Sequence, residues 1–452
     1  MSQVHFLQGR QHEKVVFDYF FRQLPFGGGY AILAGVDTLL DILEDFSFSV
    51  EDLSYIKSQG LDPRFIEYLK TLRFTGSIRG LREGDLIFPN APILQIEANI
   101  IEAQIIETVV LNILNFQSLI ATKASRMRDV AKDKTLIDFG MRRAQGPGSY
   151  YASRAAVIGG FDATSHVRAA RDFGIPVSGT MAHAFIQSYD SELQAFEDYA
   201  ESQEDKCVLL VDTYDTLKSG VPNAILVGKK LEAEGHKLMA IRLDSGDLSY
   251  LAKESRAMLD QAGLHYVKIA ASNQLDEYVI KSLEEQRAPI DIFGVGTRLV
   301  TGMPDGALDG VYKLAWANDK PRIKLSENPI KTTLPGRKKV LRVQNEDGQL
   351  EGADVICLDN ESTPALMHHP HDRFKSKSLE KYQLRPLMNN LMIEGARQES
   401  RTTLQEITKF SQSQLKSLPE EYKRFENPHL YKIGISSKLR DARNALIEKY
   451  HQ

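Results

Sequence analysis

Between residues 135 and 297 the sequence repeats one pattern, in which a short apolar run ends in polar or glycine residues and a longer amphipathic segment follows. The centres of the runs lie roughly 24 to 40 residues apart, the length of a strand, a loop, a helix and a return loop. The six runs are TLIDFGM, IPVSGT, CVLLVDTY, LMAIRLDSGD, VKIAAS and DIFGVGT. Continuous apolar strands alternating with helices indicate a parallel sheet covered on both faces. Six such units in a row favour a barrel over an open sheet, although the sequence alone does not close the ring.

The polar ends of these runs predict a single site. In a barrel of parallel strands the C-terminal strand ends meet at one mouth. We therefore expect one group of side chains there, formed by Arg142, His183, Asp212, Asp244, Ser272 and Gly296.

The segments on either side of this region have mixed patterns. Residues 14–24 are rich in Val, Phe and Tyr and predict a strand, and residues 35–46 predict a helix. Two short strands are expected on either side of the turn at 89–92, as a small antiparallel unit. Residues 103–132 have helical apolar spacing. We expect their basic end to be a solvated helix face, with Arg126, Arg128, Lys132 and Lys134.

After about residue 310 the alternation stops. The segment KLSENPIKTTLPGRKKVLRV is basic and turn-rich, then strand-like, and indicates a return to the N-terminal domain. The last 80 residues are mostly amphipathic helix, as in 403–415 and 437–450. We therefore divide the chain into an N-terminal α+β sandwich domain at 1–130, an α/β barrel at 131–310, and a return to the sandwich with a C-terminal helical region at 311–452.

Length and charge limit the class of protein. At 452 residues the chain is long enough for two or three domains of roughly 100–200 residues. It has 56 lysines and arginines against 60 aspartates and glutamates, so it has no excess basic charge for a nucleic-acid backbone. The most apolar stretch, 100–116, is interrupted by glutamates and amides, and the N-terminal residues contain no apolar signal core. With Cys207 and Cys357 far apart in sequence, we expect a cytoplasmic enzyme that binds neither nucleic acid nor membrane.

Two adjacent arginines, Arg142 and Arg143, follow the first apolar run and precede a predicted helix. Guanidinium groups bind phosphates or carboxylates in a bidentate geometry. The neighbouring glycines Gly140, Gly146 and Gly148 allow the backbone to approach a ligand closely. The alternative is a pair of arginines in surface salt bridges.

Carboxylates end two of the other runs. Asp244 can accept a sugar hydroxyl or hold Mg²⁺ through water, whereas Asp247, in the same DSGD segment, can serve as the N-cap of the following helix. Asp212, followed by Thr213, allows the same two interpretations.

Two further runs end in groups that suit a phosphate. The turn GVGT, with Gly294, Gly296 and Thr297, presents successive backbone N–H groups, although it is neither a dinucleotide-binding fingerprint nor a Walker loop. Ser272 and Asn273 can extend this cradle or merely cap a helix.

Histidines give one candidate and one weaker signal. His183 lies at the predicted mouth beside Gly179 and Thr180, where it could act as a nucleophile, transfer a proton or be structural. The run HHPH at 368–371 has no set of partner ligands for a metal, and we interpret it as an exposed loop. The sequence has no GxSxG, HExxH or paired CxxC motif, so common hydrolase and metalloprotease functions lack support.

Taken together, these motifs resemble the nicotinate phosphoribosyltransferase family. The matching segments, in the family's order between about residues 14 and 345, are DFGMRRAQGP, GGFDATSHV, IPVSGTMAHAF, VDTYDTLKSGVPNAI, IRLDSGDL, FGVGTRLVTG, GVYKL and KLSENPIKTTLPGRKKVLR. The resemblance implies an α/β fold, with an irregular (β/α) barrel of the phosphoribosyltransferase kind. It further implies an α+β open-sandwich domain built from N- and C-terminal segments, and a homodimer that shares residues across its interface.

The resemblance also implies a reaction. Nicotinate and 5-phosphoribosyl 1-pyrophosphate would give nicotinate mononucleotide and pyrophosphate, the first step of NAD salvage from nicotinate. ATP hydrolysis would be coupled to the transfer through a phosphohistidine, which His183 matches. Mg²⁺ is expected with ATP and phosphoribosyl pyrophosphate, without an assigned side-chain ligand.

Site roles follow from motif positions. Phe139 would stack on the pyridine ring, and Ser165 would help recognise the carboxylate of nicotinate. Arg142 and Arg242 would meet this carboxylate or the phosphates, and Asp244 would hold ribose hydroxyls. The catalytic set implied is His183, Asp244 and Arg242, and the substrate-binding set is Phe139, Arg142, Arg143, Ser165, Thr180, Asp212, Ser272, Asn273, Gly294, Gly296 and Thr297, the last three at the 5′-phosphate.

Two departures from the family pattern stand out. Family members usually have an Asp-Leu/Phe-Tyr-Gln segment just before the stretch that begins here at Met1, and its tyrosine would stack on the ring from the neighbouring subunit. Its absence predicts either a start placed too far downstream or a form without half of the aromatic clamp. His166 stands where the family commonly has Asn, which predicts a local change in hydrogen bonding.

Three alternatives remain at this point. Nicotinamide phosphoribosyltransferase shares the barrel and the histidine, but an acidic residue at Ser165 would have supported it. The decarboxylating quinolinate enzyme needs neither ATP nor a matching histidine. A non-catalytic regulator would bind phosphoribosyl pyrophosphate or the mononucleotide without turnover.

Overall fold

The computed structural model describes residues 1–451 of the chain. Their contacts divide into two compact units. One unit, here called the barrel unit, comprises residues 120–306, and the other, here called the split unit, combines residues 1–119 with the chain from residue 307 onward. Within residues 1–451, no helix has both the length and the apolar character that a membrane span requires.

The barrel unit contains a six-stranded parallel sheet in the order β7-β6-β11-β10-β9-β8. Every residue of β8 and β11 is buried, as expected for strands covered on both faces. Among the described residues no hydrogen-bonded ladder joins β7 to β8, so the barrel-like sheet is irregular. The strands are β6 (Thr135–Asp138), β7 (Ala163–Thr164), β8 (Val208–Leu210), β9 (Ala240–Leu243), β10 (Lys268–Ser272) and β11 (Ile292–Val295).

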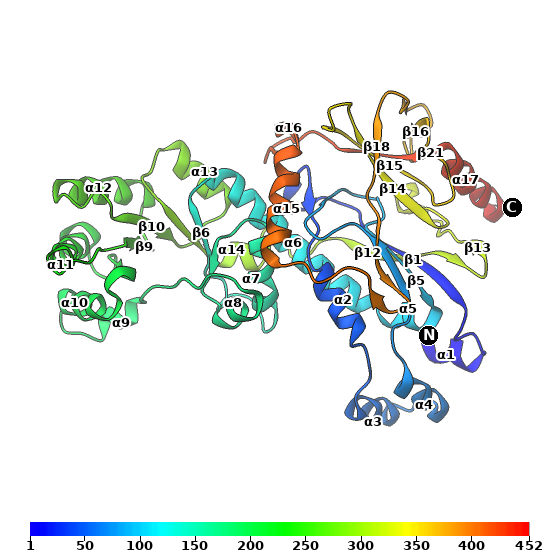
Figure 1. Ribbon diagram of the computed structural model, residues 1–452, viewed down its shortest axis with the longest axis horizontal. Coiled ribbons are helices and arrows are strands. Elements are labelled where there is room, and N and C mark those ends of the chain that lie inside the picture. Colours follow the sequence, from blue (N-terminus) through cyan, green and yellow to red (C-terminus); the bar gives the residue numbers. More distant parts are fainter. Residues whose placement is uncertain (452) are drawn as a thin grey trace. The chain divides into compact units, whose positions relative to one another are not determined.

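Helices follow the strands in sequence, and Figure 1 shows them arranged around the sheet of this unit. One of them, Thr216–Gly220, is a π-helix. The others are α7 (Gly148–Ile158), α8 (Val167–Phe173), α9 (His183–Gln187), α10 (Glu192–Gln203), α11 (Val221–Ala233), α12 (Leu248–Gln261), α13 (Glu277–Glu285) and α14 (Thr297–Val300), with a short 3-10 turn at Glu204–Lys206. The predicted alternation of parallel strands and helices is therefore confirmed.

One of the six predicted strands is wrong. The run IPVSGT forms only an isolated parallel bridge, between Thr164 and Val177. The strand at this place in the sheet is instead β7, at Ala163–Thr164. Pro176 explains the difference, because proline lacks the N–H that a continuous ladder needs. Its carbonyl still accepts a hydrogen bond from the Thr164 N–H, at 3.1 Å.

The split unit contains two large sheets and a two-stranded sheet. The first has the order β13-β12-β1-β5-β3-β19-β20, the second β17-β16-β21-β15-β14-β18, and β2 pairs with β4. Early strands are β1 (Lys14–Phe21), β2 (Ala31–Ile32), β3 (Ser77–Gly80), β4 (Leu86–Ile87) and β5 (Leu94–Asn99). Late strands are β12 (Gly310–Ala317), β13 (Lys320–Pro321), β14 (Lys338–Gln344), β15 (Leu350–Leu358), β16 (Leu366–His368), β17 (Ser376–Ser378), β18 (Gln383–Pro386), β19 (Asn389–Ile393), β20 (Ala396–Arg397) and β21 (Lys432–Ser436).

The first large sheet joins both ends of the chain, since β12 pairs with β1 and β19 pairs with β3. A single hydrophobic core includes Ile96 of that sheet and Val340 and Ile356 of the second sheet. The unit is thus an α+β sandwich of N- and C-terminal segments, as the resemblance implied. Its helices are α1 (Ser2–Leu7), α2 (Val36–Glu44), α3 (Val50–Ser58), α4 (Pro63–Thr71), α5 (Ile100–Ile105), α15 (Leu404–Ser417), α16 (Glu420–Lys423) and α17 (Ser437–His451), with 3-10 turns at Pro25–Gly27 and Pro329–Lys331.

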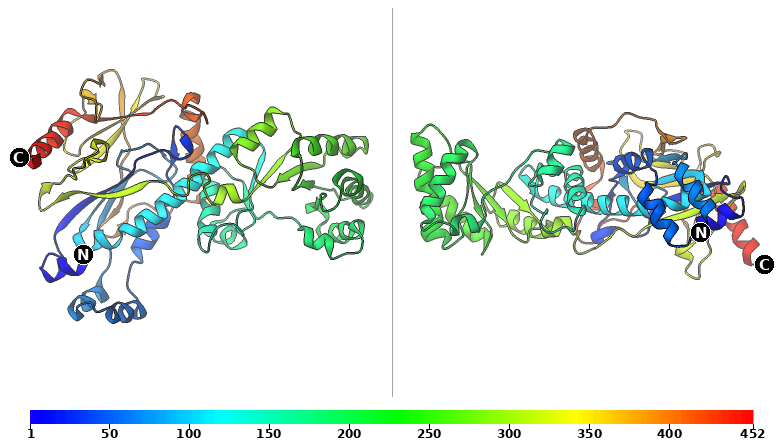
Figure 2. Two further views of the ribbon diagram at one scale, coloured as in Figure 1. Left: turned by 180° about the vertical axis from the view of Figure 1, so that it is seen from behind. Right: turned by 90° about the horizontal axis from the view of Figure 1, so that it is seen from below.

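The C-terminal helix α17 packs against β15, β16 and β21, and Figure 2 shows it from two further sides. Between residues 376 and 397 the chain forms four short strands, so the last 80 residues are less helical than predicted. These strands take up the free edges of both large sheets, a tertiary pairing that local sequence does not specify.

The small antiparallel unit predicted around residues 89–92 is also wrong. The strands β4 and β5 exist, but β4 pairs with β2, and β5 pairs with β1 and β3. The turn between them carries Asn90 in a left-handed conformation, with φ of 66°, and its N–H bonds to the Phe21 carbonyl. The chain therefore passes from one sheet to another instead of forming a hairpin.

The basic end of the long helix is solvated only in part, because Lys132 is exposed whereas Arg126 and Arg128 are not. The predicted helix is divided into α5 and α6 (Glu107–Ala131), and Arg126 is only 2% exposed. Arg128 is mostly buried too, and it bonds to the Gly160 carbonyl and to the Asp162 carboxylate. Specific acceptors on neighbouring segments thus take up these cations, which the periodicity of one helix cannot reveal.

His368 departs from the predicted exposed loop at 368–371. It ends β16 and is 9% exposed, and its ring nitrogen Nε2 lies 2.9 Å from the Ser437 hydroxyl. Among residues 1–451 no group of three or more His, Cys, Asp or Glu side chains is arranged to hold a metal ion.

Candidate active site

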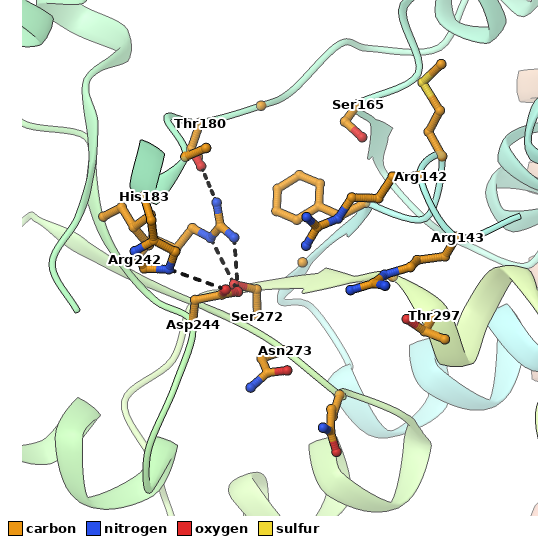
Figure 3. Close-up of a pocket in the computed structure, with 18 of the residues that line it drawn as sticks. Arg142, Arg143, Ser165, Thr180, His183, Arg242, Asp244, Ser272, Asn273 and Thr297 are labelled. Atoms are coloured by element: carbon orange, nitrogen blue, oxygen red, sulfur yellow. Dashed lines mark hydrogen bonds and ion pairs between the residues drawn. The ribbon is translucent and has the colours of Figure 1, made fainter. Parts of the chain in front are cut away.

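A cavity of about 830 Å³ lies at the C-terminal ends of the barrel-unit strands (Figure 3). The structure brings all the predicted site residues to this cavity except Asp212, which lies behind its lining. The lining residues that the sequence predicted are Phe139, Arg142, Arg143, Ser165, Thr180, His183, Arg242, Asp244, Ser272, Asn273, Gly294, Gly296 and Thr297. Their convergence follows from parallel strands that end at one edge.

Arg242, at the third position of β9, organises one wall of the cavity. Its guanidinium donates to the Ser272 hydroxyl at 2.9 Å, to the Thr180 hydroxyl at 2.7 Å and to Asp244 Oδ1 at 3.0 Å. The Ser272 hydroxyl also donates to Asp244 Oδ1. These bonds, drawn in Figure 3, hold residues from three segments in one arrangement before any ligand binds.

The environment of Asp244 keeps its carboxylate ionised. Partial burial alone would raise the pKa of this group. The hydrogen bond from Ser272 and the positive charge of Arg242 outweigh that effect, so the pKa is lowered from its ordinary value. Asp244 is therefore available as a charged acceptor for hydroxyl groups.

His183 begins α9 and faces two carboxylates. Its Nε2 atom lies 3.9 Å from Asp212 Oδ1 and 3.8 Å from Asp244 Oδ2, and its Nδ1 atom lies 3.1 Å from the Thr213 hydroxyl. The side chain is 39% exposed, so a ligand in the cavity can reach the ring. Flanking carboxylates stabilise the positive charge that an imidazole acquires when it attacks an electrophile.

Asp212 acts from behind the lining. Its side chain is 1% exposed, and Oδ2 accepts hydrogen bonds from the Asp244 N–H at 2.8 Å and the Ser245 hydroxyl at 2.6 Å. It therefore fixes the turn after β9. In the same segment Asp247 is the N-cap of α12 and accepts from the Tyr250 N–H, which confirms that interpretation.

The ring of Phe139 borders the cavity beneath Arg242, whose guanidinium carbon lies 5.5 Å from the ring centre. Phe139 is held beside β11, because its N–H bonds to the Val295 carbonyl at 2.8 Å. A Cβ atom at Gly294 would lie 2.4 Å from the ring. The glycine at 294 is thus required by the aromatic ring, a reason that the sequence motif did not give.

Asp138, the last residue of β6, is a buried residue that the sequence analysis missed. Its Oδ1 accepts from the Gly140 N–H, and its Oδ2 accepts from the hydroxyls of Ser153 and Thr164. Its carbonyl accepts from both the N–H and the hydroxyl of Ser165. Burial raises the pKa of Asp138. The residue orders the segment before Arg142, and its position as the last polar residue of a strand was the available signal.

The cavity has a positive character. Four arginines line it, of which Arg298 was not predicted, and Asp244 is the one carboxylate among the lining residues. Neither Arg142 nor Arg143 forms an ion pair within residues 1–451, which argues against the surface salt-bridge alternative. Other lining residues missed by the sequence analysis are Met141, Met181, Ala182, Leu210, Gln274 and Met303. Most of them lie one or two residues from a predicted one.

His166 is the N-cap of α8 and is 5% exposed. Its Nδ1 atom accepts the Ala169 N–H at 3.4 Å. Asparagine is among the preferred N-cap residues, and histidine fulfils the N-cap function here.

Comparison with known proteins agrees with this geometry. A family model described as the nicotinate phosphoribosyltransferase (NAPRTase) family matches residues 135–372, more than half of the chain. The chain belongs to this family. The N-terminal domain model of the same family matches residues 1–115, and its C-terminal domain model matches residues 337–443.

Individual relatives extend the match over nearly the whole chain. The nicotinate phosphoribosyltransferase of Bacillus subtilis is 44% identical, over 96% of this chain and 91% of its own length, and that of Caenorhabditis elegans is 35% identical, over 97% and 90%. The crystal structure of human nicotinic acid phosphoribosyltransferase superposes with a TM-score of 0.89 at 29% identity, covering 99% of this chain and 98% of the human one. A nicotinate-nucleotide pyrophosphorylase from Pyrococcus furiosus gives a TM-score of 0.72 at 25% identity, covering 92% of each chain.

Proposed function

We propose that this protein transfers the phosphoribosyl group of 5-phosphoribosyl 1-pyrophosphate to nicotinate. The ring nitrogen of nicotinate forms a bond to C1 of the ribose, the bond from C1 to the pyrophosphate oxygen breaks, and nicotinate mononucleotide and pyrophosphate are released. Family membership over the whole chain supports this reaction. The reaction also fits a cavity that offers an aromatic ring, several cations and an ionised carboxylate.

Each part of the substrates has a chemically suitable partner. The ring of Phe139 offers a stacking surface for pyridine, worth about 0.5–1.5 kcal/mol beyond simple burial. Arg142 and Arg143 suit the carboxylate of nicotinate or the phosphates. Asp244 suits the ribose hydroxyls, and the turn at 294–297 suits the 5′-phosphate. The four arginines that line the cavity favour the charged nicotinate over neutral nicotinamide.

The coupling to ATP that we propose is supported by the position of His183 between Asp212 and Asp244. In the proposed step a ring nitrogen of neutral His183 attacks the γ-phosphorus of ATP, the bond to the bridging oxygen breaks, and ADP leaves. Later hydrolysis of the P–N bond releases phosphate and restores the histidine. A phosphorylated imidazole would add negative charge to a cavity lined by four arginines and help to order the sugar substrate, so that part of the free energy of ATP hydrolysis is used for binding.

The carboxylates fit the Mg²⁺ ion that the family resemblance implies. Oδ1 of Asp212 is buried without a hydrogen-bond partner among residues 1–451, and Oδ2 of Asp244 faces the same space beside His183. Carboxylate oxygens are the ligands that Mg²⁺ prefers, and this ion keeps several of its waters. When bound together with pyrophosphate, Mg²⁺ would neutralise part of the charge of the leaving group. We place the reaction in the cytoplasm, and a homodimer is the assembly that the resemblance implies.

The proposal is tested by measuring product from nicotinate and phosphoribosyl pyrophosphate, with and without ATP. We expect nicotinate mononucleotide in both cases and a marked increase with ATP. Parallel reactions with nicotinamide and with quinolinate test the alternative substrates. Thermal unfolding with each ligand tests the non-catalytic alternative, because binding without any product would indicate a regulator.

A further inference from the structure

Three charged side chains are buried together in the barrel unit. Glu277, the first residue of α13, is fully buried, while Lys123 and Arg126 of α6 are 1% and 2% exposed. The Lys123 ammonium lies 2.6 Å from Glu277 Oε2, and the Arg126 guanidinium donates to Glu277 Oε1 at 2.9 Å. The two cations are three residues apart and so lie on one face of α6.

This cluster connects two helices, α6 and α13. Burial lowers the pKa of Lys123, and the charge of Glu277 offsets only part of that shift. A buried charge pair adds little stability compared with apolar residues of the same volume, but removing one partner leaves an uncompensated charge and is strongly destabilising. The arrangement therefore allows few alternative positions for the start of α13.

The start of α13 is also the end of a segment that lines the cavity. Only four residues, 273–276, connect β10 to α13. Asn273 and Gln274 have φ of 83° and 50°, the left-handed region that is unfavourable for non-glycine residues, and both line the cavity. Figure 3 shows Asn273 on this segment, directly after Ser272.

The two ends of this connection are fixed in different ways. At one end Ser272 belongs to β10, and its hydroxyl bonds to Asp244. At the other end Asp276 is the N-cap of α13 and accepts from two backbone N–H groups, at 2.9 and 3.0 Å. Beyond this cap, Glu277 links the helix to α6. Two consecutive strained residues persist only where the surrounding structure holds both ends.

We infer that Glu277 is a positioning residue for the cavity, whose ion pairs with Lys123 and Arg126 hold Asn273 and Gln274 in the conformation that faces the ligand. The ligand that this segment would contact is the phosphoribosyl pyrophosphate of the proposed function. The kinetic part of the test therefore rests on that function. The side-chain amides and the backbone N–H groups of this segment suit phosphate oxygens.

The test compares Glu277→Gln with Asp354→Asn, a matched control in the split unit. Asp354 forms a buried pair with Arg342, at 3.0 Å and with side-chain exposures of 3% and 0%. Both substitutions replace a buried, paired carboxylate by an amide of similar size. Two measurements are made well below the unfolding temperature, namely hydrogen exchange of the Tyr278 and Val279 amides, which bond to the Asp276 cap, and the steady-state constants for phosphoribosyl pyrophosphate.

For Glu277→Gln we expect at least tenfold faster exchange at the Tyr278 and Val279 amides and at least a fivefold increase in the KM for phosphoribosyl pyrophosphate, with kcat changed less than twofold. Asp354→Asn should lower the unfolding temperature and change neither quantity. The double variant K123M/E277Q, which removes one cation with the carboxylate, should regain stability but keep the raised KM and the fast exchange. It also carries the test if Glu277→Gln alone does not fold.

A purely structural role predicts a different result. If the Glu277 variants lose only thermal stability, with exchange at the Tyr278 and Val279 amides and the KM as in the wild type, the inference is overturned. If the wild-type protein forms no product, the proposed function fails instead, and the hydrogen-exchange comparison still decides whether Glu277 holds this segment.

Discussion

Substitution of Gly294 by alanine tests how closely the aromatic ring is fitted to the strand beside it. The added Cβ atom would lie 2.4 and 2.5 Å from two ring carbons of Phe139. Ordinary contacts between carbon atoms are about 3.5–4.0 Å, so the ring must move by about 1 Å. The backbone of Phe139 cannot follow, because its N–H is bonded to the Val295 carbonyl of the same strand.

The magnitude follows from this displacement. The ring borders an open cavity and can rotate into it, so the cost in stability should be about 1 kcal/mol, the low end for overpacking. A misplacement of about 1 Å at a reacting group can lower the rate by about 100-fold, which is about 2.7 kcal/mol. We therefore expect kcat/KM for nicotinate to fall by about 10- to 100-fold in Gly294→Ala, with only a small decrease in unfolding temperature.

The assay is steady-state product formation with nicotinate varied at saturating phosphoribosyl pyrophosphate. Gly306→Ala is the control, because a Cβ atom there meets no atom within 4 Å. In a Phe139→Ala background the substitution at Gly294 has no ring to displace and should have little further effect, so the two changes should not be additive. Unchanged kinetics in Gly294→Ala, or full additivity with Phe139→Ala, would refute the reasoning.

Three further predictions concern the charged residues of the cavity. His183→Ala should fold and lose the increase in product caused by ATP, and an unchanged ATP effect would exclude His183 as the phosphorylated residue. Arg242→Ala removes hydrogen bonds to three side chains and should weaken the binding of nicotinate or phosphoribosyl pyrophosphate by about 2–4 kcal/mol, seen as a raised KM for at least one of them. The pKa of Asp244 is lower in the folded protein than in the unfolded chain, where it is about 3.9. The carboxylate therefore stabilises the fold at a pH above about 3.9, and this stabilisation is lost as the pH falls through the pKa of the folded state. Urea unfolding should therefore find Asp244→Asn less stable than the wild type at pH 7, with the difference shrinking below pH 4; a difference independent of pH would contradict this assignment.

The strands of the barrel unit were predictable because their apolar runs are continuous. A strand buried on both faces needs no alternation, and the runs that became β8 and β11 are buried along their whole length. Once these strands are parallel, their C-terminal ends must lie at one edge, which placed Arg242 and Ser272 together. The run IPVSGT failed because Pro176 interrupts the ladder, a local feature that outweighed its apolar composition.

Contacts between distant segments were the part that the sequence could not predict. Arg126 is indistinguishable from a solvated helix residue until Glu277, 151 positions later, is placed against it. Asp138 is similar, because its acceptor role depends on hydroxyls from two other segments. Periodicity describes one element at a time, whereas the burial of a charge depends on its partner.

The choice of substrate is encoded in the charge of the cavity more than in any single residue. The Ser165 hydroxyl donates to the Asp138 carbonyl, so it faces a ligand mainly as an acceptor and cannot by itself select a carboxylate. The selection must then come from cations, of which Arg142 and Arg143 have no carboxylate partner within residues 1–451. Replacing Ser165 by aspartate would introduce a like charge beside nicotinate, and would offer a second acceptor to the amide of nicotinamide. The cost to nicotinate binding should therefore exceed any gain for nicotinamide, since the arginines would still favour an anion.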